Sequence, residues 1–246
     1  DTRTDAQLSI TSGAVNFPAQ GLYVTRLTDE DKNVSYEFKN KLGQVLLTRQ
    51  MNGTTAHDTY YVYDSFGNLR AVLPPLAADA LKTATSWPET NTTVARYAYL
   101  YKYDNRNRMI GKKLPGTAWI TYVYDKADRM IFSQDGEQAA KTTKEWTFYL
   151  YDAFGRQVLQ GTCTNTNTAS VANVVVTTTF AATNTGIGSS GYTSSFAITS
   201  PTVQQVNYYD DYSFRSLTGF DNANFPAATV SAKGMLTGSV TAVLDS

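Results

Sequence analysis

The chain has 246 residues, with 21 basic and 21 acidic side chains, so its formal net charge at pH 7 is zero. Without a basic cluster, this balance argues against nucleic-acid binding and against attachment to an anionic membrane surface. Hydrophobic residues form 42% of the chain, which excludes wholesale disorder. No stretch approaches the roughly 18 apolar residues of a membrane span. We therefore expect a folded domain with no nucleic-acid partner and no membrane span.

The aromatic content favours β-structure. Tyrosine alone supplies 17 residues and aromatic residues reach 13% of the chain, a composition typical of pleated, half-buried strands. We predict an all-β fold in a single domain, residues 1–246. Its consecutive antiparallel β-hairpins would form a strongly twisted, curved sheet with one short helix insertion. Residues 1–33 begin with a polar stretch that does not look like a signal peptide, and we interpret them as an N-terminal lead-in.

The predicted core, residues 34–160, is built from a repeated octet. Its pattern is Tyr-x-Tyr-Asp, with Gly, Asn or Asp three positions after the aspartate. A degenerate first copy has Asn40 in the aspartate position and Gly43 three residues later. Further copies occupy residues 61–68, 101–108, 122–129, 149–156 and, in a looser form, 207–213. Such repetition indicates an array of one supersecondary unit.

Each octet predicts a strand followed by a turn. Before the aspartate, residues alternate between the two faces of a strand, so Tyr97, Tyr99, Tyr101 and Tyr103 share one face. The aspartate begins the turn because its carboxylate can accept a hydrogen bond from a backbone N–H about two residues on. Three residues after the aspartate the chain needs a positive φ, as in a type I turn closed by a G1 bulge, and Gly, Asn and Asp tolerate that region best. The turn-forming residues are Asp64 with Gly67, Asp104 with Asn107, Asp125 with Asp128, and Asp152 with Gly155. Ser213 breaks this rule in the last copy.

The longer intervals between octets hold insertions. Residues 74–81 start with proline and are rich in alanine, which predicts a short helix, and residues 82–93 predict a loop. Residues 161–205 are rich in Thr, Ser and Asn and carry no charge. We interpret them as one further hairpin, in which residues 171–180 pair with residues 194–199. A disordered linker is the alternative, and the β-branched run argues against it. Residues 206–246 hold the last degenerate repeat and a tail.

No catalytic or metal motif is present. The chain lacks a P-loop, a His-Glu-x-x-His motif and a Gly-x-Ser-x-Gly elbow, and it has one histidine and one cysteine, Cys163. The repeat aspartates are explained by their turns. The short acidic clusters, residues 29–31 and 210–211, are typical of solvated turns, with weak cation binding as the alternative. We therefore expect no enzymatic activity, no cofactor and no metal site.

Aromatic side chains are the one ligand-like feature, because their flat amphipathic surfaces can stack on sugars or on an extended polypeptide. The candidates for ligand stacking are Trp87, Trp119, Trp146, Tyr99 and Tyr101. The competing interpretation is that these rings only cover the face of the sheet, and we favour it.

The repeated Tyr-x-Tyr-Asp-x-x-Gly-Arg pattern, most complete in residues 149–156, resembles the tyrosine–aspartate (YD) repeats of rearrangement hotspot (Rhs) proteins. Related repeats occur in insecticidal toxin-complex shells and teneurins. Residues 23–31 and 234–239 also look like stretches of long bacterial Rhs-type proteins. The resemblance spans about residues 36–212, most of the chain.

The resemblance implies a β-sheet that spirals into a hollow shell around a toxin or another polypeptide, or an extracellular scaffold. This chain has too few repeats to close a shell, and it lacks both the self-cleavage region and an appended toxin domain. It therefore looks like a piece of a larger protein or a small relative. We expect a non-catalytic structural segment of a secreted or bacterial cell-surface protein. Its partners would be the remainder of a larger repeat protein, or a second copy through the sheet edges. The alternative is a module that binds carbohydrate or polypeptide.

Overall fold

The computed structural model describes residues 9–11, 20–84, 86–220 and 222–243, and antiparallel strands dominate it. The strands of the main sheet are β2 (Tyr23–Thr28), β3 (Val34–Lys39), β4 (Val45–Asn52), β5 (Thr55–Tyr63), β6 (Leu69–Leu73), β8 (Tyr99–Tyr103), β9 (Met109–Lys113), β10 (Trp119–Tyr124), β11 (Met130–Gln134), β12 (Trp146–Tyr151), β13 (Gln157–Cys163), β16 (Thr202–Asp210) and β17 (Ala232–Thr241).

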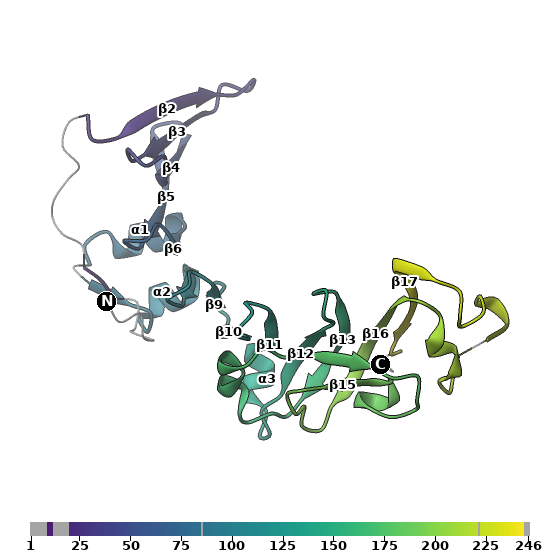
Figure 1. Ribbon diagram of the computed structural model, residues 1–246. Helices are drawn as coiled ribbons and strands as arrows, with labels where there is room; N and C mark the ends of the chain where they lie inside the picture. The colour runs from purple at the N-terminus through teal and green to yellow at the C-terminus, as the bar shows by residue number, and fades with distance from the viewer. Residues whose placement is uncertain (1–8, 12–19, 85, 221, 244–246) are drawn as a thin grey trace. The chain divides into compact units, whose positions relative to one another are not determined.

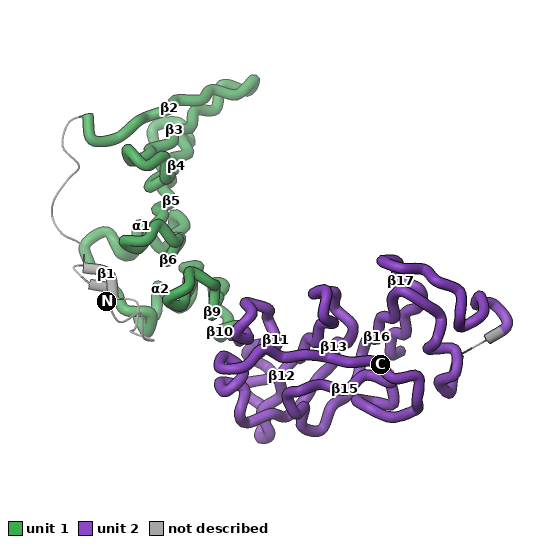
Figure 2. Tube along the Cα trace, viewed as in Figure 1, with its two compact units in different colours: residues 1–120 green, residues 121–246 purple. Residues whose placement is uncertain are grey.

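These 13 strands form one sheet in the order β17-β16-β13-β12-β11-β10-β9-β8-β6-β5-β4-β3-β2 (Figure 1). Neighbours in the sheet are neighbours in sequence except at β6–β8 and β13–β16, where insertions intervene. The all-β fold of consecutive hairpins is thus confirmed. The chain divides into two compact units, residues 1–120 and 121–246 (Figure 2).

The hairpins close by five-residue turns of one kind. These turns join β3 to β4, β5 to β6, β8 to β9, β10 to β11, and β12 to β13. In each hairpin the register shifts at the last residue before the turn, for example between Val62 and Tyr63 and between Leu150 and Tyr151. Such a bulge bends the strand and increases its local twist. The same turn and the same bulge therefore recur along the sheet.

The insertion of the first unit contains more regular structure than we expected. The predicted helix is α1 (Pro75–Leu81). The predicted loop, residues 82–93, is wrong, because it contains β7 (Ser86–Pro88), paired with β1 (Ser9–Thr11), and the start of α2 (Thr92–Tyr97). Tyr97 consequently lies in a helix and not on the strand with Tyr99. Asn91 explains this change, since its side chain accepts hydrogen bonds from the N–H groups of Thr93 and Val94 and so caps the helix.

The insertion of the second unit is also folded, but not as the predicted hairpin. Only β14 (Thr178–Phe180) pairs with β15 (Tyr192–Ser194), and residues 168–173 form a 3-10 helix. Val171 and Val176 are buried in a cluster with strand residues of the main sheet. Burying these valines against the sheet removes apolar surface from water, which the predicted pairing of residues 171–180 with residues 194–199 would not achieve.

Two further expectations need correction. Within the described residues there are three α-helices, not one, the third being α3 (Gly136–Ala140). The last degenerate repeat does not form a tight hairpin, because residues 211–231 separate β16 from β17. There Asp210 itself has a positive φ of 75°, and Asp211 accepts hydrogen bonds from the backbone and side chain of Ser213.

In each unit the insertions cover part of the sheet and form a hydrophobic cluster with it. In the first unit, Ala71, Leu73 and Leu100 of the sheet form a cluster with Leu81 of α1 and Val94 of α2, and Figure 1 shows α1 beside β6. In the second unit the cluster combines side chains of β11, β12, β13 and β16 with side chains of the insertion and of the stretch after β16; its members include Phe132, Phe148, Leu150, Leu159, Val206, Val171, Val176, Tyr192, Phe214 and Leu217. The insertions therefore complete the hydrophobic cores.

Gly161 on β13 gives a test of this packing. A Cβ atom there would overlap the carbonyl oxygen of Thr202 on the neighbouring strand and the ring of Phe148. We expect Gly161→Ala to lower the free energy of unfolding by about 1–3 kcal/mol, because the backbone of β16 cannot move aside without strain. Chemical denaturation would measure the change.

The matched control is Gly155→Asn in the same unit. Gly155 has φ 80° with open space around its Cα, and asparagine tolerates that conformation. The free energy of unfolding of this variant should stay within about 1 kcal/mol of that of the wild type. Equal stability of the Gly161→Ala variant and the wild type would contradict the proposed close packing.

Candidate functional site: the aspartate turns and the Arg156 cluster

The first residue of each five-residue turn organises the backbone through one side-chain oxygen. The Oδ1 atom accepts hydrogen bonds from the N–H groups of the residues two and four positions on, at 2.9–3.0 Å. The residue three positions on has φ between 62° and 84°. The residues that begin these turns are Asn40, Asp64, Asp104, Asp125 and Asp152, and those with positive φ are Gly43, Gly67, Asn107, Asp128 and Gly155.

The second side-chain oxygen has a partner that our sequence analysis did not assign. In three turns the arginine four positions on donates from Nε to Oδ2, at 2.7 Å in Arg108, 3.1 Å in Arg129 and 2.6 Å in Arg156. In the Asp64 turn, Asn68 takes this place at 3.1 Å. The recurring Arg at the end of the octet was the available signal, because a guanidinium suits a carboxylate at this distance.

These contacts favour the charged form of the Asp64 and Asp104 carboxylates, whose pKa values lie below the usual range. Burial raises the pKa of Asp104, but hydrogen bonds from the Arg108 side chain and from the Arg108 and Arg106 backbones outweigh burial, and the pKa lies below its usual value. The turns of the first unit also contact one another: Gln44 donates to the Gly67 carbonyl at 3.4 Å, and Asn68 donates to Asn107 at 3.0 Å. Adjacent turns are thus linked side to side.

The Asp125 turn holds the insertion of the second unit. Asp125 is fully buried, and its Oδ2 accepts from Arg129 at 2.7 Å and from the backbone N–H of Val176 at 3.2 Å. Arg129 in turn donates to the carbonyl of Val176 at 2.5 Å, and the Lys126 N–H donates to the carbonyl of Val174 at 2.8 Å. One turn therefore anchors the segment that covers the sheet.

The Asp152 turn forms a larger polar cluster around Arg156. Besides its bond to Asp152, Arg156 binds Asp210 through two bonds, from Nη1 at 3.0 Å and from Nη2 at 2.6 Å. Its guanidinium lies 4.4 Å from the ring centre of Tyr209 and 5.0 Å from that of Phe154, both suitable for cation–π contacts. Asp210 is therefore paired, and our interpretation of the Asp210–Asp211 stretch as a solvated turn is wrong for Asp210.

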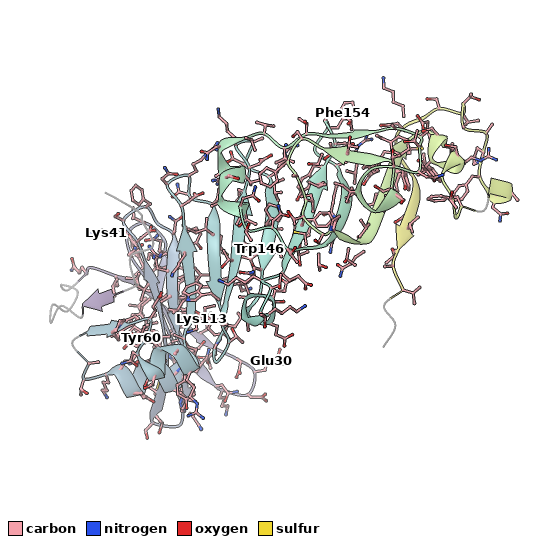
Figure 3. The ribbon with its side chains drawn as sticks, turned by 90° about the horizontal axis from the view of Figure 1, so that it is seen from below. Glu30, Lys41, Tyr60, Lys113, Trp146 and Phe154 are labelled. Atoms are coloured by element: carbon pink, nitrogen blue, oxygen red, sulfur yellow. The ribbon has the colours of Figure 1, made fainter. Side chains whose placement is uncertain are left out.

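The exposed residues at the turn tips are apolar in three cases. Leu42 is 83% exposed, Phe66 53% and Phe154 79%. Figure 3 labels Phe154 at its turn and Trp146 on β12, within the second unit. Single exposed apolar residues are ordinary, but Phe154 lies beside the Arg156 cluster and lines a cavity there.

The candidate stacking residues lie in two separate clusters. Trp87 is buried and Trp119 half-buried in the cluster of the first unit, where Lys102 lies 4.3 Å from the ring centre of Trp119. Trp146 packs edge-on against Phe132 in the second unit. Tyr99 and Tyr101 are half-buried on β8. Trp87 and Trp119 share the cluster of the first unit, Trp146 belongs to that of the second, and the role of these residues in stacking stays a prediction.

Other chemistry-bearing groups show no constellation. Cys163 is buried, and burial raises the pKa of its thiol to about 11, so the reactive thiolate is scarce at neutral pH. In the described part of the chain, no group of three His, Cys, Asp or Glu side chains could hold a metal ion. Over the same residues, no helix is both long and apolar enough to cross a membrane.

Comparisons with known proteins find the fold but not a family. No protein-family model matches the chain, and no curated protein matches it. The crystal structure of TcdB2-TccC3 matches 79% of this chain with a TM-score of 0.50 and 12% identity, and the match covers 8% of that chain. The crystal structure of TcdB2-TccC3-Cdc42 matches 79% of this chain with a TM-score of 0.50 and 11% identity, again over 8% of that chain.

A further match is the Photorhabdus luminescens Tc holotoxin pore, with a TM-score of 0.46 and 12% identity over 77% of this chain and 7% of that chain. At identities this low, the two matches with a TM-score of 0.50 show a shared fold alone. The chain spans under a tenth of the length of the proteins that it resembles.

The Asp125 anchor can be tested by substitution. We expect Asp125→Ala to lower the free energy of unfolding by about 3 kcal/mol, because it leaves Arg129 without its counter-ion at a buried site. The N–H of Val176 should also exchange faster with solvent, since it loses its acceptor. Denaturation and hydrogen exchange would measure the two effects. The control is Asp64→Ala, whose carboxylate accepts from Phe66 and Asn68 of its own turn; this change should lower the free energy of unfolding by about 1 kcal/mol. Equal losses for both variants would contradict the anchor.

The Arg156–Asp210 contact predicts a pH dependence. Hydrogen bonds from Arg156, and then from the N–H of Gly234, lower the pKa of Asp210 to about 2, against about 3.9 in an unfolded chain. The contact therefore stabilises the fold fully above about pH 4 and is lost as the pH falls toward 2. In unfolding experiments at a series of pH values, the free energies of unfolding of the wild type and of Asp210→Asn should converge over this window. A difference that stays constant down to pH 2 would contradict the assignment.

Proposed function

We propose that the chain is a structural segment of a larger Rhs-type repeat protein, secreted or located at the bacterial cell surface, and that it catalyses no reaction. The observation that carries this proposal is the array of hairpins closed by one kind of turn, in which a side-chain oxygen of the first turn residue accepts two backbone N–H groups. In a sheet of this kind the recurring polar side chains form hydrogen bonds with the backbone of their own turns. Few of them are then available for catalysis. The shared fold with TcdB2-TccC3, at a TM-score of 0.50, supports the same proposal.

The sheet edges supply the partner surface in this proposal. β2 lies at one end of the strand order and β17 at the other. Tyr23 and Leu27 on β2, and Met235 and Leu236 on β17, are exposed apolar residues. An exposed edge strand with apolar side chains pairs readily with another strand. The natural partner is the remainder of a larger repeat protein, and in its absence a second copy of this chain.

Sedimentation velocity tests the edge pairing. We expect the mean sedimentation coefficient to rise with protein concentration. Leu27→Lys on β2 and Leu236→Lys on β17 should reduce this rise, because a charge on an edge strand opposes pairing. Leu42→Lys, at an exposed turn tip outside the edge strands, is the matched control and should leave it unchanged. A monomer at every concentration would count against edge pairing.

A glycan array separates the scaffold from the alternative, a carbohydrate-binding module. The scaffold role predicts no selective glycan binding, since the tryptophans lie within hydrophobic clusters. Selective binding that is abolished by Trp119→Ala would favour the alternative.

A further inference from the structure

The second unit contains a cavity of about 260 Å³ beside the Asp152 turn. Its apolar lining includes the rings of Phe180 on β14, Tyr192 on β15 and Phe214 in the 3-10 helix Ser213–Ser216. Its polar lining includes the carboxylates of Asp152, Asp210 and Asp211 and the guanidinium of Arg156. This volume lies just below the usual range of small-molecule sites, about 300–1,000 Å³, so it suits a single small group.

The charge balance of the lining is negative. Three carboxylates and one guanidinium leave a formal charge of −2. The charge of Arg156 is already compensated, because its Nε atom binds Asp152 and its two Nη atoms bind Asp210, contacts that use three of its five N–H groups. A negatively charged ligand would therefore meet repulsion without a free cation to receive it.

Two polar groups at this cavity remain unused. The second oxygen of Asp211 has no hydrogen-bond partner in the described part of the chain, since Ser213 contacts only Oδ1. Thr178 is 6% exposed, and its hydroxyl oxygen has no partner among the described residues. A buried hydroxyl without a partner is unfavourable. Both groups can accept a hydrogen bond, so both suit a ligand that donates.

We propose that this cavity binds an organic cation, a guanidinium or primary ammonium group of the size of an arginine or lysine side chain. Asp211 acts as its counter-ion, and the rings of Phe180, Tyr192 and Phe214 enclose its carbon chain and charge. The cluster already holds one such group, since Arg156 is bound by carboxylates and lies against the Tyr209 ring. The proposal is independent of the scaffold role.

The test uses the whole chain with n-butylguanidinium as the probe and n-butylurea as its neutral counterpart. We expect NMR shifts of the cavity residues to saturate with n-butylguanidinium and not with n-butylurea. Asp211→Asn should weaken binding about tenfold, the effect of losing one charge-assisted hydrogen bond. The variant keeps the oxygen that accepts from Ser213, so it should remain folded, which near-UV circular dichroism of the tyrosines would verify.

Asp31→Asn makes the same change of net charge outside the cavity and should leave the affinity unchanged. Equal binding of the two probes, no shifts at the cavity, or an unchanged affinity of Asp211→Asn would each overturn the proposal. A short peptide with one central arginine, blocked at both ends, identifies the source of the cation. Tighter binding of the peptide than of n-butylguanidinium assigns the site to a polypeptide side chain, and equal binding assigns it to free cations.

Discussion

The fold depends on one interaction, the acceptance of two backbone N–H groups by a single oxygen at the start of each turn. Those donors lie two and four residues further along, so the contact fixes the whole reversal within five residues. Without it, the N–H groups of a tight turn would need water or another acceptor. Because the fifth residue of the turn is also the partner of the second oxygen in most copies, the motif satisfies its own charge locally. Each turn is therefore closed by contacts within its own five residues, whereas the hydrophobic cores also need side chains from the insertions.

The hairpins could be predicted because their signals are local. A two-residue period before the aspartate and a Gly, Asn or Asp after it are properties of eight consecutive residues. The insertions could not, because their structure depends on what they cover. The run around Val174 has high β-propensity, yet Val171 and Val176 are buried against the sheet, and burial overrides propensity. Tyr97 continues the alternation of Tyr99 and Tyr101, but the cap at Asn91 draws it into a helix.

The contacts of Arg156 show the same limit on what the sequence alone can predict at the candidate site. Arg156 lies four positions after Asp152, so this contact lies within a single octet. Its contact with Asp210 joins residues that lie 54 positions apart, and no periodicity in the sequence relates them. The cavity beside it likewise takes its walls from a turn, two short strands and a 3-10 helix. A site assembled from segments so distant in sequence becomes visible only in three dimensions.

The two long margins of the sheet differ in how freely their connections change length. On the margin that carries the aspartate turns, five of the six connections have five residues each, and residues 211–231 between β16 and β17 form the one longer connection among the described strands. On the opposite margin, the connections range from residues 53–54 between β4 and β5 to residues 164–201 between β13 and β16. Lengthening a surface connection costs little, since closure entropy grows only with the logarithm of its length. Evolution of new recognition surfaces should therefore concentrate on that second margin, where whole helices and hairpins can be added while the ladder beneath them keeps its spacing.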